Sequence, residues 1–501
     1  MGPWPEGSPR SRSSPDRRTA REVIVETERR LVGIDLGIAS SHTVRVLTGD
    51  GSEVCRRRCE PTAASLAMVA AAALAGAPAG TGLEVIMEPT GPAWLPVAVY
   101  FLQRGHRVYR VSSAKASALR RFLSRHAKSN GIDADTLARL PLMDPAGLQP
   151  LELPEAARAE LERRVRATDR LTQEAATHKV RLKDFVRQLL PMTPLRGDLC
   201  RADLAVLERT GGHPDRILGL GRRRLTAIIV GASNDHLGAE RADDWLESAT
   251  RSSELYAKHA AFAADALADD VLTELRLLTA IEGELARHAA ARERAYCAVD
   301  SKQLARSLPG VSTIGAPALV ALMGRPGRFE HGDQFRSYSG LAPRASETGD
   351  TDRKGQVMSK AGPGLLRTTL VRAADTARKQ DPQLARVYHA QMTQRGAPHI
   401  KALCVVAAHL AERSLLVMKR GTAYVVRDVD GTQVSPEEAK VIIATRYTVT
   451  EEQRARRRSK KTRKAPQKVL EAHVEARRPS SPVMVTDRGA VASAVGTARA
   501  S

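Results

Sequence analysis

A segment near the start of the chain carries a carboxylate in a setting where metal chemistry is common. Residues 31–37 have the sequence LVGIDLG, in which Asp35 lies inside an apolar, strand-like run and is followed by Gly37. Burying an unpaired carboxylate costs free energy, so an aspartate placed in this way usually has a partner, often a metal ion. The alternative interpretation is a buried strand with an acidic end.

Two further acidic sites follow along the chain. Residues 83–91 have the sequence LEVIMEPTG, with Glu88 after a second apolar run, and residues 128–135, KSNGIDAD, place Asp133 on an expected helix. Aspartate on a first strand, glutamate on a later strand and aspartate on a following helix resemble the layout of ribonuclease-H-like nucleases. That layout gathers carboxylates around divalent metal for phosphodiester chemistry. The order of the three sites therefore favours a metal site.

The charge balance of the chain indicates a polyanionic partner. The 501 residues are enough for two to four domains, and 78 Lys and Arg against 56 Asp and Glu give a formal net charge of +22. Such an excess favours nucleic acid, although solvated basic tails carry much of it. Aromatic residues make up only 3% of the chain. We therefore do not expect single strands to be bound mainly by base stacking.

The cysteines and the apolar segments exclude several classes of protein. Only Cys55 and Cys59 lie close together in sequence, and no second pair of ligands accompanies them, so we expect no zinc site. Few, scattered cysteines suit a reducing cytoplasm. The start of the chain has no apolar core of a signal peptide, and no apolar run reaches about 18 residues, so we expect no membrane contact.

Sequence patterns divide the chain into five parts: a disordered basic tail at 1–30, an α/β domain at 31–150, a helical linker at 151–306, a C-terminal domain at 307–449 and a second disordered basic tail at 450–501. Within the α/β domain we expect strands at 31–37, 41–47, 53–58, 83–87 and 107–111, and helices at 64–75 and 94–104. Three strands in a meander, followed by alternating helix and strand, predict a mixed sheet with helices on both faces.

The middle of the chain predicts long helices. Residues 155–190 and 257–295 are rich in Ala, Leu, Glu and Arg, and they could form an antiparallel coiled coil. Such a pair would serve as a dimerisation arm, as an arm that spans nucleic acid, or as a plain spacer.

A helix-hairpin-helix is expected at the start of the C-terminal domain. Residues 308–315 have the sequence LPGVSTIG and precede an apolar helix at 316–323. Gly310 and Gly315 would let the hairpin amides approach a DNA phosphate closely.

Taken together, the motifs resemble those of insertion-sequence transposases of the DEDD type, the IS-one-ten group, over about residues 31–449. The resemblance implies a ribonuclease-H-like (Holliday-junction-resolvase-like) N-terminal domain, a long coiled-coil middle and a mainly α C-terminal domain. It implies a DNA transposase that cleaves and joins strands with Mg²⁺ or Mn²⁺. It further implies double-stranded DNA and a guide RNA from the same element as partners, a homodimer or homotetramer, and a bacterial, cytoplasmic protein that joins the nucleoid when bound to DNA.

The family pattern implies four acidic metal ligands. Asp35 matches the first and Glu88 the second, while the last two normally lie three residues apart on a helix. Those positions hold Asn130 and Asp133 here, so an amide replaces the third acid. Residues three apart share a helix face, which Asp133 and Asp135 do not. An asparagine oxygen can still coordinate a hard cation.

The family pattern also implies a nucleophilic serine in a polar loop after Gly340–Pro343. We favour Ser346, with Thr348 and Ser359 as alternatives. Several cations near this loop in sequence would neutralise phosphate charge during strand transfer: Arg344, Arg353, Lys354, Lys360 and Arg367.

Two rival functions remain open at this point. In a metal-dependent junction-resolving nuclease, water would attack and the C-terminal domain would only bind DNA. In a degenerate transposase, the chain would bind nucleic acid without catalysis, which the replacements at Asn130 and Thr348 would explain.

Overall fold

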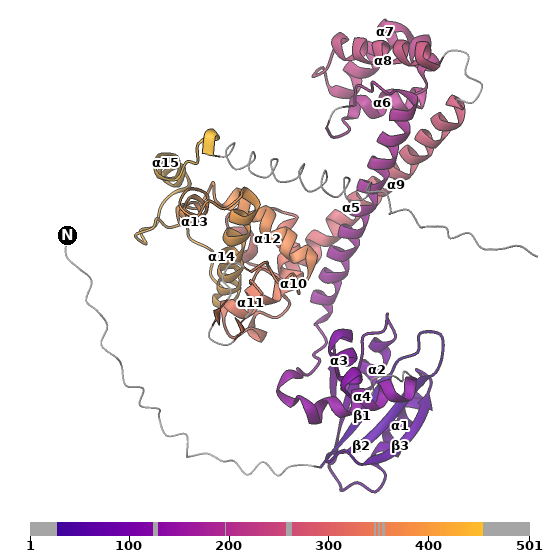
Figure 1. The fold of residues 1–501 in the computed structure, drawn as a ribbon, viewed down its shortest axis with the longest axis vertical. Helices are drawn as coiled ribbons and strands as arrows, with labels where there is room; N and C mark the ends of the chain where they lie inside the picture. The colour runs from indigo at the N-terminus through magenta and orange to yellow at the C-terminus, as the bar shows by residue number, and fades with distance from the viewer. Residues whose placement is uncertain are drawn as a thin grey trace, which may run out of the picture. The chain divides into compact units, whose positions relative to one another are not determined.

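A computed structural model describes residues 28–123, 129–195, 197–256, 263–344, 347–348, 351–352 and 356–453 (Figure 1). The chain divides into two compact units, residues 1–154 and residues 155–501. The expected tails at 1–30 and 450–501 therefore lie almost wholly outside the described residues. None of the helices in the described ranges is both long and apolar enough to cross a membrane.

The first unit is built on a five-stranded mixed sheet, as the sequence predicts. Its strands are β1 (Arg29–Asp35), β2 (His42–Thr48), β3 (Glu53–Cys59), β4 (Gly82–Met87) and β5 (Arg107–Arg110), in the order β3-β2-β1-β4-β5. The first three strands pair antiparallel as a meander, and β4 and β5 pair parallel to β1 and to each other. The carboxyl ends of β1, β4 and β5 therefore meet at one edge of the sheet.

Helices cover both faces of this sheet because apolar side chains alternate along its strands. One face carries Val32, Ile34 and Val44 and packs against α1 (Ala63–Leu74) and α2 (Trp94–Leu102). The opposite face packs against α3 (Ser113–Leu123) and α4 (Asn130–Met143), with a short 3-10 turn η1 (Pro145–Gly147) after them. This second face is the one that includes Gly33 and Asp35.

The packing of α4 on β1 depends on the missing side chain at Gly33. A Cβ built at Gly33 would lie 2.0 Å from the carbonyl oxygen of Ala134 and 2.5 Å from the amide nitrogen of Ala138. These are backbone atoms of α4, which cannot move without moving the helix. Glycine at position 33 therefore sets how closely α4 lies on the sheet, and so where its first turn lies.

The second unit begins with two long antiparallel helices, α5 (Ala156–Leu189) and α9 (Ala264–Val299), which lie side by side in Figure 1. Leu161 near the start of α5 shares an apolar core with Tyr296 near the end of α9, whereas Val186 near the end of α5 shares another with Val271 near the start of α9, so the two helices run in opposite directions. The predicted long helices are confirmed. Three helices at one end of the pair were not predicted: α6 (Arg201–Thr210), α7 (Pro214–Ser233) and α8 (Ala239–Tyr256).

The remaining elements form a mainly helical domain at the other end of the pair: η2 (Leu304–Ser307), α10 (Gly315–Met323), η3 (Pro326–Arg328), α11 (Gly332–Tyr338), the two-stranded β6 (Glu347–Thr348) and β7 (Thr351–Asp352), α12 (Gly364–Ala377), α13 (Pro382–Thr393), α14 (His399–Arg420) and α15 (Pro436–Arg446). Leu161 and Val165 of α5 and Tyr296 of α9 share its apolar core. The base of the helical pair is therefore part of this domain and not a separate spacer.

We predict that Gly33→Ala lowers the free energy of unfolding of the full-length protein by about 1–3 kcal/mol, because the added methyl group overlaps the backbone of α4. Urea unfolding followed by circular dichroism measures this change. Gly283→Ala is the matched control, since a Cβ at this exposed position in α9 meets nothing within 4 Å. That control should be neutral or slightly stabilising. Equal stability of the Gly33→Ala protein and the parent would contradict the packing described.

Candidate metal centre and nucleic-acid surface

Asp35 and Glu88 lie next to each other in register at the carboxyl edge of the sheet. Asp35 is the last residue of β1, and Glu88 directly follows β4. Ile34 is paired with Met87 in the parallel ladder, so Asp35 and Glu88 are the next step along the two strands. Neighbouring strands lie about 4.8 Å apart, which brings the two backbones close together.

These two acids belong to the sheet face that α4 covers. Residues two apart on a strand point to the same face, so Asp35 shares the face of Gly33. Asp133 lies in the first turn of α4, directly before Ala134, whose carbonyl oxygen faces Gly33. The three expected ligands therefore come from two strand ends and from a helix that crosses the same face.

Arg120 of α3 supplies positive charge to this acidic group. Its Nη1 donates a hydrogen bond to Oδ1 of Asp133 at 2.8 Å, and both side chains are only about one quarter exposed or less. The hydrogen bond to Asp133 is the main cause that raises the pKa of Arg120, and the charges of Asp133 and Glu88 add to it. The guanidinium thus lies within electrostatic reach of carboxylates from both α4 and the end of β4.

The loop that follows Asp35 is held by a buried histidine. The Gly37 amide donates a hydrogen bond to Nδ1 of His42 at 3.1 Å. Burial lowers the pKa of His42, although the charge of Glu60 opposes this effect. The neutral ring is the form that can accept the bond from Gly37. His42 therefore fixes the turn between β1 and β2, beside Asp35.

Asn130 and Asp135, two other polar residues in the first turns of α4, have different neighbours. Asn130 is exposed and is the first residue of the helix, after the Ser129 N-cap. Asp135 forms an ion pair with Arg139 one turn later. The hydrogen bond to Glu53 is the main cause that raises the pKa of Arg56 on β3, and the charge of Asp135 adds to it. Asp133 and Asp135 thus have different partners, as the helix geometry predicts.

The donor set fits a hard divalent cation in kind, because carboxylate and amide oxygens are the ligands preferred by Mg²⁺ and Mn²⁺. Its placement at two strand ends and one helix start also fits. Within the described ranges, however, no three His, Cys, Asp or Glu side chains are gathered closely enough to hold a metal ion. The pairing of Asp133 with Arg120 gives a physical reason for this arrangement. Binding of a cation would require the Asp133 carboxylate to exchange its guanidinium partner.

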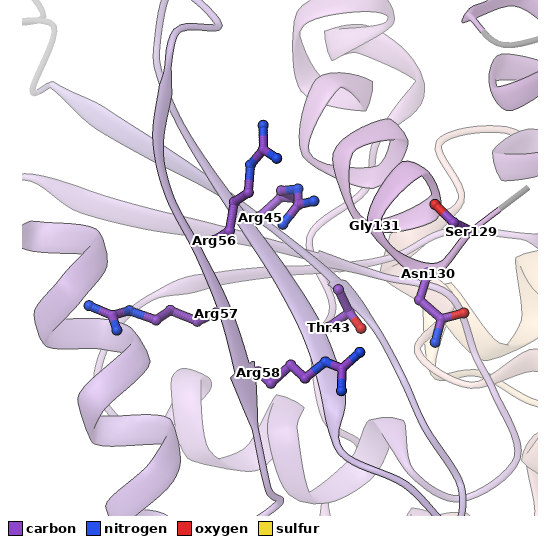
Figure 2. Close-up of a pocket in the computed structure, with 8 residues that line it drawn as sticks. All are labelled: Thr43, Arg45, Arg56, Arg57, Arg58, Ser129, Asn130 and Gly131. Atoms are coloured by element: carbon purple, nitrogen blue, oxygen red, sulfur yellow. The ribbon is translucent and has the colours of Figure 1, made fainter. Parts of the chain in front are cut away.

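A basic cavity lies on the same sheet face, and we name it the arginine basin. Its volume is about 600 Å³, and Figure 2 shows its lining residues: Thr43, Arg45, Arg56, Arg57, Arg58, Ser129, Asn130 and Gly131. No carboxylate is among them. Sequence patterns did not predict this site. The run of three arginines at 56–58 was the available signal, but only the strand register shows which of them meet Arg45.

The two hairpin glycines have partners within the chain. The Gly310 amide donates to Oε1 of Gln380 at 2.8 Å, and the Gly315 amide donates to Oγ of Ser312 at 3.0 Å. Gly310 also packs against the backbone of α12 near Ala373, which a side chain would prevent. Contact of these amides with a DNA phosphate remains a prediction, and it would require both bonds to be exchanged.

Of the three candidate nucleophilic hydroxyl groups, the structure describes only one side chain. Ser346 lies outside the described residues, and Thr348 belongs to β6, where only the backbone is described. Ser359 is described: its Oγ is fully covered and has no hydrogen-bond partner in this part of the structure. A covered hydroxyl cannot reach a phosphate without rearrangement of its loop, so the structure favours a nucleophile elsewhere.

The cations near this loop are partly described. Arg344 and Lys360 are exposed and Arg367 is half-buried, whereas Arg353 and Lys354 lie outside the described residues. Among the described side chains, no carboxylate forms an ion pair with Arg344, Lys360 or Arg367.

Comparison with known proteins points to one family. A family model of the DEDD type of IS110, described as a transposase, matches residues 32–191, and a model described as the transposase IS116/IS110/IS902 family matches residues 302–390. A Streptomyces coelicolor protein named "Insertion element IS110 uncharacterized 43.6 kDa protein" is 24% identical over 359 residues, which are 71% of this chain and 86% of that protein.

Two further relatives match shorter stretches. The putative transposase y4pF/y4sB of Sinorhizobium fredii is 34% identical over 129 residues, 25% of this chain and 32% of its own length. A probable family 20 transposase of Pseudomonas aeruginosa is 35% identical over 101 residues, 20% of this chain and 29% of its own length. The chain therefore spans about a third or less of each of these two proteins.

We predict that Arg120→Gln tightens binding of Mn²⁺ to the full-length protein by up to about fivefold, because a partly exposed ion pair no longer competes for Asp133. Titration calorimetry measures this change. Arg121→Gln is the matched control, since the adjacent Arg121 is exposed and its Nε donates to the carbonyl oxygen of Ser117. Weaker Mn²⁺ binding by Arg120→Gln would show that Arg120 orients Asp133 as a ligand and does not compete with the metal.

Proposed function

The chain belongs to the IS110 family of transposases, and from this premise we propose that its first unit cleaves DNA strands with a divalent metal held by Asp35, Glu88 and Asp133. The observation that carries the proposal is the position of Asp35 and Glu88 at the ends of adjacent parallel strands, while Asp133 lies on the helix that packs on Gly33.

The fold of the first unit supports a ribonuclease-H-like, Holliday-junction-resolvase-like domain. The strand order β3-β2-β1-β4-β5 places the first and fourth strands side by side. Asp35 and Glu88 thereby reach the same edge, although they lie 53 positions apart in sequence. The following helix α4, which carries Asp133 in its first turn, would supply the third ligand.

Asp35, Glu88 and Asp133 would hold Mg²⁺ or Mn²⁺, with the Asn130 oxygen as a neutral fourth ligand. When bound, such a cation polarises a phosphodiester and stabilises negative charge on its oxygens. Arg120 holds the Asp133 carboxylate in place before binding through a hydrogen bond of 2.8 Å. Substitution of an acid by Asn130 reduces the negative charge of the site by one.

The second unit would supply the nucleophile, for which we propose the hydroxyl of Ser346. Its oxygen would attack the phosphorus, and the bond from phosphorus to one deoxyribose oxygen would break, leaving that sugar with a free hydroxyl group. The phosphodiester to the serine conserves the bond energy, so that a strand hydroxyl can later attack and release the serine. Arg344 and Lys360 lie near this loop in sequence and carry charge that suits a phosphate.

The family relationship also supports two kinds of partner. One is a guide RNA from the same element, and the other is further copies of this chain, in a homodimer or homotetramer. As a transposase, the chain binds DNA.

We predict that Asp35→Asn lowers strand transfer by at least about a hundredfold, because the neutral amide no longer offers the charge that the cation requires. Binding of DNA should remain close to that of the parent protein. A strand-transfer assay with labelled DNA and a binding assay in the same buffer measure the two effects.

Asp135→Asn is the matched control for this experiment. Asp135 lies on the same helix as Asp133, but it pairs with Arg139 and belongs to no proposed ligand set. This variant should retain strand transfer. If Asp35→Asn abolished DNA binding together with strand transfer, Asp35 would be a structural residue and the proposed metal centre would be wrong.

We predict that Ser346→Ala eliminates a covalent protein–DNA adduct, while Ser359→Ala leaves it intact. The Ser359 hydroxyl is covered and has no partner in the described structure, so its replacement by a methyl group should also cost little stability. Denaturing gel electrophoresis with labelled DNA, followed by peptide mapping, identifies the modified residue.

Other outcomes of the hydroxyl experiment assign the reaction differently. Loss of the adduct only in Thr348→Ala would move the nucleophile to Thr348. Cleavage without any adduct in the parent protein would mean that water attacks, and the chain would then be a metal-dependent junction-resolving nuclease.

A further inference from the structure

Three guanidinium groups of the arginine basin belong to the same sheet face as the acidic residues. The antiparallel register pairs Asp35 with Thr43 and Thr43 with Arg58, so these three residues form one row across β1, β2 and β3. Directly opposite residues in a ladder share a face. Arg58 therefore continues the row that begins with Glu88 and Asp35, two strand spacings or roughly 10 Å from Asp35.

The next row holds the other two arginines. Gly33 pairs with Arg45, and Arg45 pairs with Arg56. Arg45 reaches across to the start of α4, where its Nη2 would lie 2.8 Å from a Cβ built on Gly131. The basin is thus bordered by β2 and β3 on one side and by the N-terminus of α4 on the other.

The charge of the basin is only partly balanced within the chain. Arg56 donates two hydrogen bonds to the carboxylate of Glu53. Neither Arg45 nor Arg58 forms an ion pair with any acidic side chain in the described ranges. The N-terminus of α4 adds the positive end of a helix dipole. An anionic ligand would therefore meet two guanidinium groups without carboxylate partners.

We propose that the arginine basin binds the phosphodiester backbone of a nucleic-acid strand and leads it to the carboxylates of Asp35 and Glu88. The binding itself is independent of the proposed metal centre, and only the position of the reacting phosphate rests on the proposed function. The basin, at about 600 Å³, is far larger than one phosphate needs. Its lining includes no aromatic side chain, so it suits contact with the backbone and not stacking with bases.

Arg57 also lines the basin, but its side chain differs in direction from those of its neighbours. It lies between Arg56 and Arg58 on the same edge strand, but its ladder partner is Val44, which belongs to the opposite sheet face. Figure 2 shows its guanidinium turned away from those of Arg45, Arg56 and Arg58. The alternative role of arginines on an edge strand is to discourage edge-to-edge pairing of sheets. In that role Arg56, Arg57 and Arg58 would be equivalent.

The test measures binding of the full-length protein to labelled duplex DNA, and separately to a structured RNA, at several salt concentrations. EDTA is present throughout, so that loss of metal binding cannot alter the result. The variants are Arg58→Gln, Arg45→Gln and the control Arg104→Gln, an exposed arginine outside the basin that follows α2 on the opposite sheet face. Circular dichroism of each variant checks that the fold is kept.

We expect Arg58→Gln and Arg45→Gln each to weaken binding several-fold and to reduce the slope of log affinity against log salt by about 0.9 for duplex DNA, the loss of one phosphate contact. Arg104→Gln should leave the slope unchanged. An effect with DNA identifies a DNA strand as the occupant, and an effect with RNA alone identifies an RNA strand. Equal effects of Arg104→Gln and Arg58→Gln, or no effect of either basin variant, would overturn the proposal.

Failure of this proposal is distinguishable from failure of the metal centre. Unchanged nucleic-acid binding by the basin variants leaves the Asp35→Asn result untouched. Conversely, full activity of Asp35→Asn would refute the metal centre without affecting the salt dependence measured in EDTA.

Discussion

The close contact between Gly33 and α4 is the constraint on which the arrangement of the first unit depends. Because position 33 has no side chain, the backbone of α4 at Ala134 and Ala138 lies directly against β1. This contact places Asp133 over the strand that ends in Asp35, and it places Asn130 beside the arginine basin. A larger residue would lift the helix from the sheet and separate both groups at once.

Opposite charges are organised around this contact in two different ways. On the side of α3, Arg120 is paired with Asp133 and is stabilised further by Glu88, so the acids are already partly neutralised. On the side of β3, Arg45 and Arg58 have no carboxylate partner among the described residues. A phosphate group would gain from the second arrangement without breaking an ion pair, whereas a metal cation would have to replace Arg120.

Sequence patterns predicted the sheet and the long helices well, because both have simple periodicities. The alternation around Val32 and Ile34 identified β1, and the repeat of apolar residues identified α5 and α9. The helices α6 to α8 were missed because short amphipathic helices resemble the long ones in composition. The arginine basin was missed because the pairing of Arg45 with Arg56 depends on strand register, which a sequence does not state. Likewise, the partners of Asp133 and Gly310 could not be predicted, since Arg120 and Gln380 approach them only in the folded chain.

The central claim is that Asp35, Glu88 and Asp133 hold a divalent cation on the face covered by α4. Crystals of the full-length protein soaked with Mn²⁺, with anomalous diffraction data, test this claim most directly. The account predicts an anomalous peak in contact with oxygens of all three carboxylates, and an Asp133 side chain that has left Arg120. No peak at these residues, or a peak bound elsewhere while the pair of Arg120 and Asp133 persists, would contradict it.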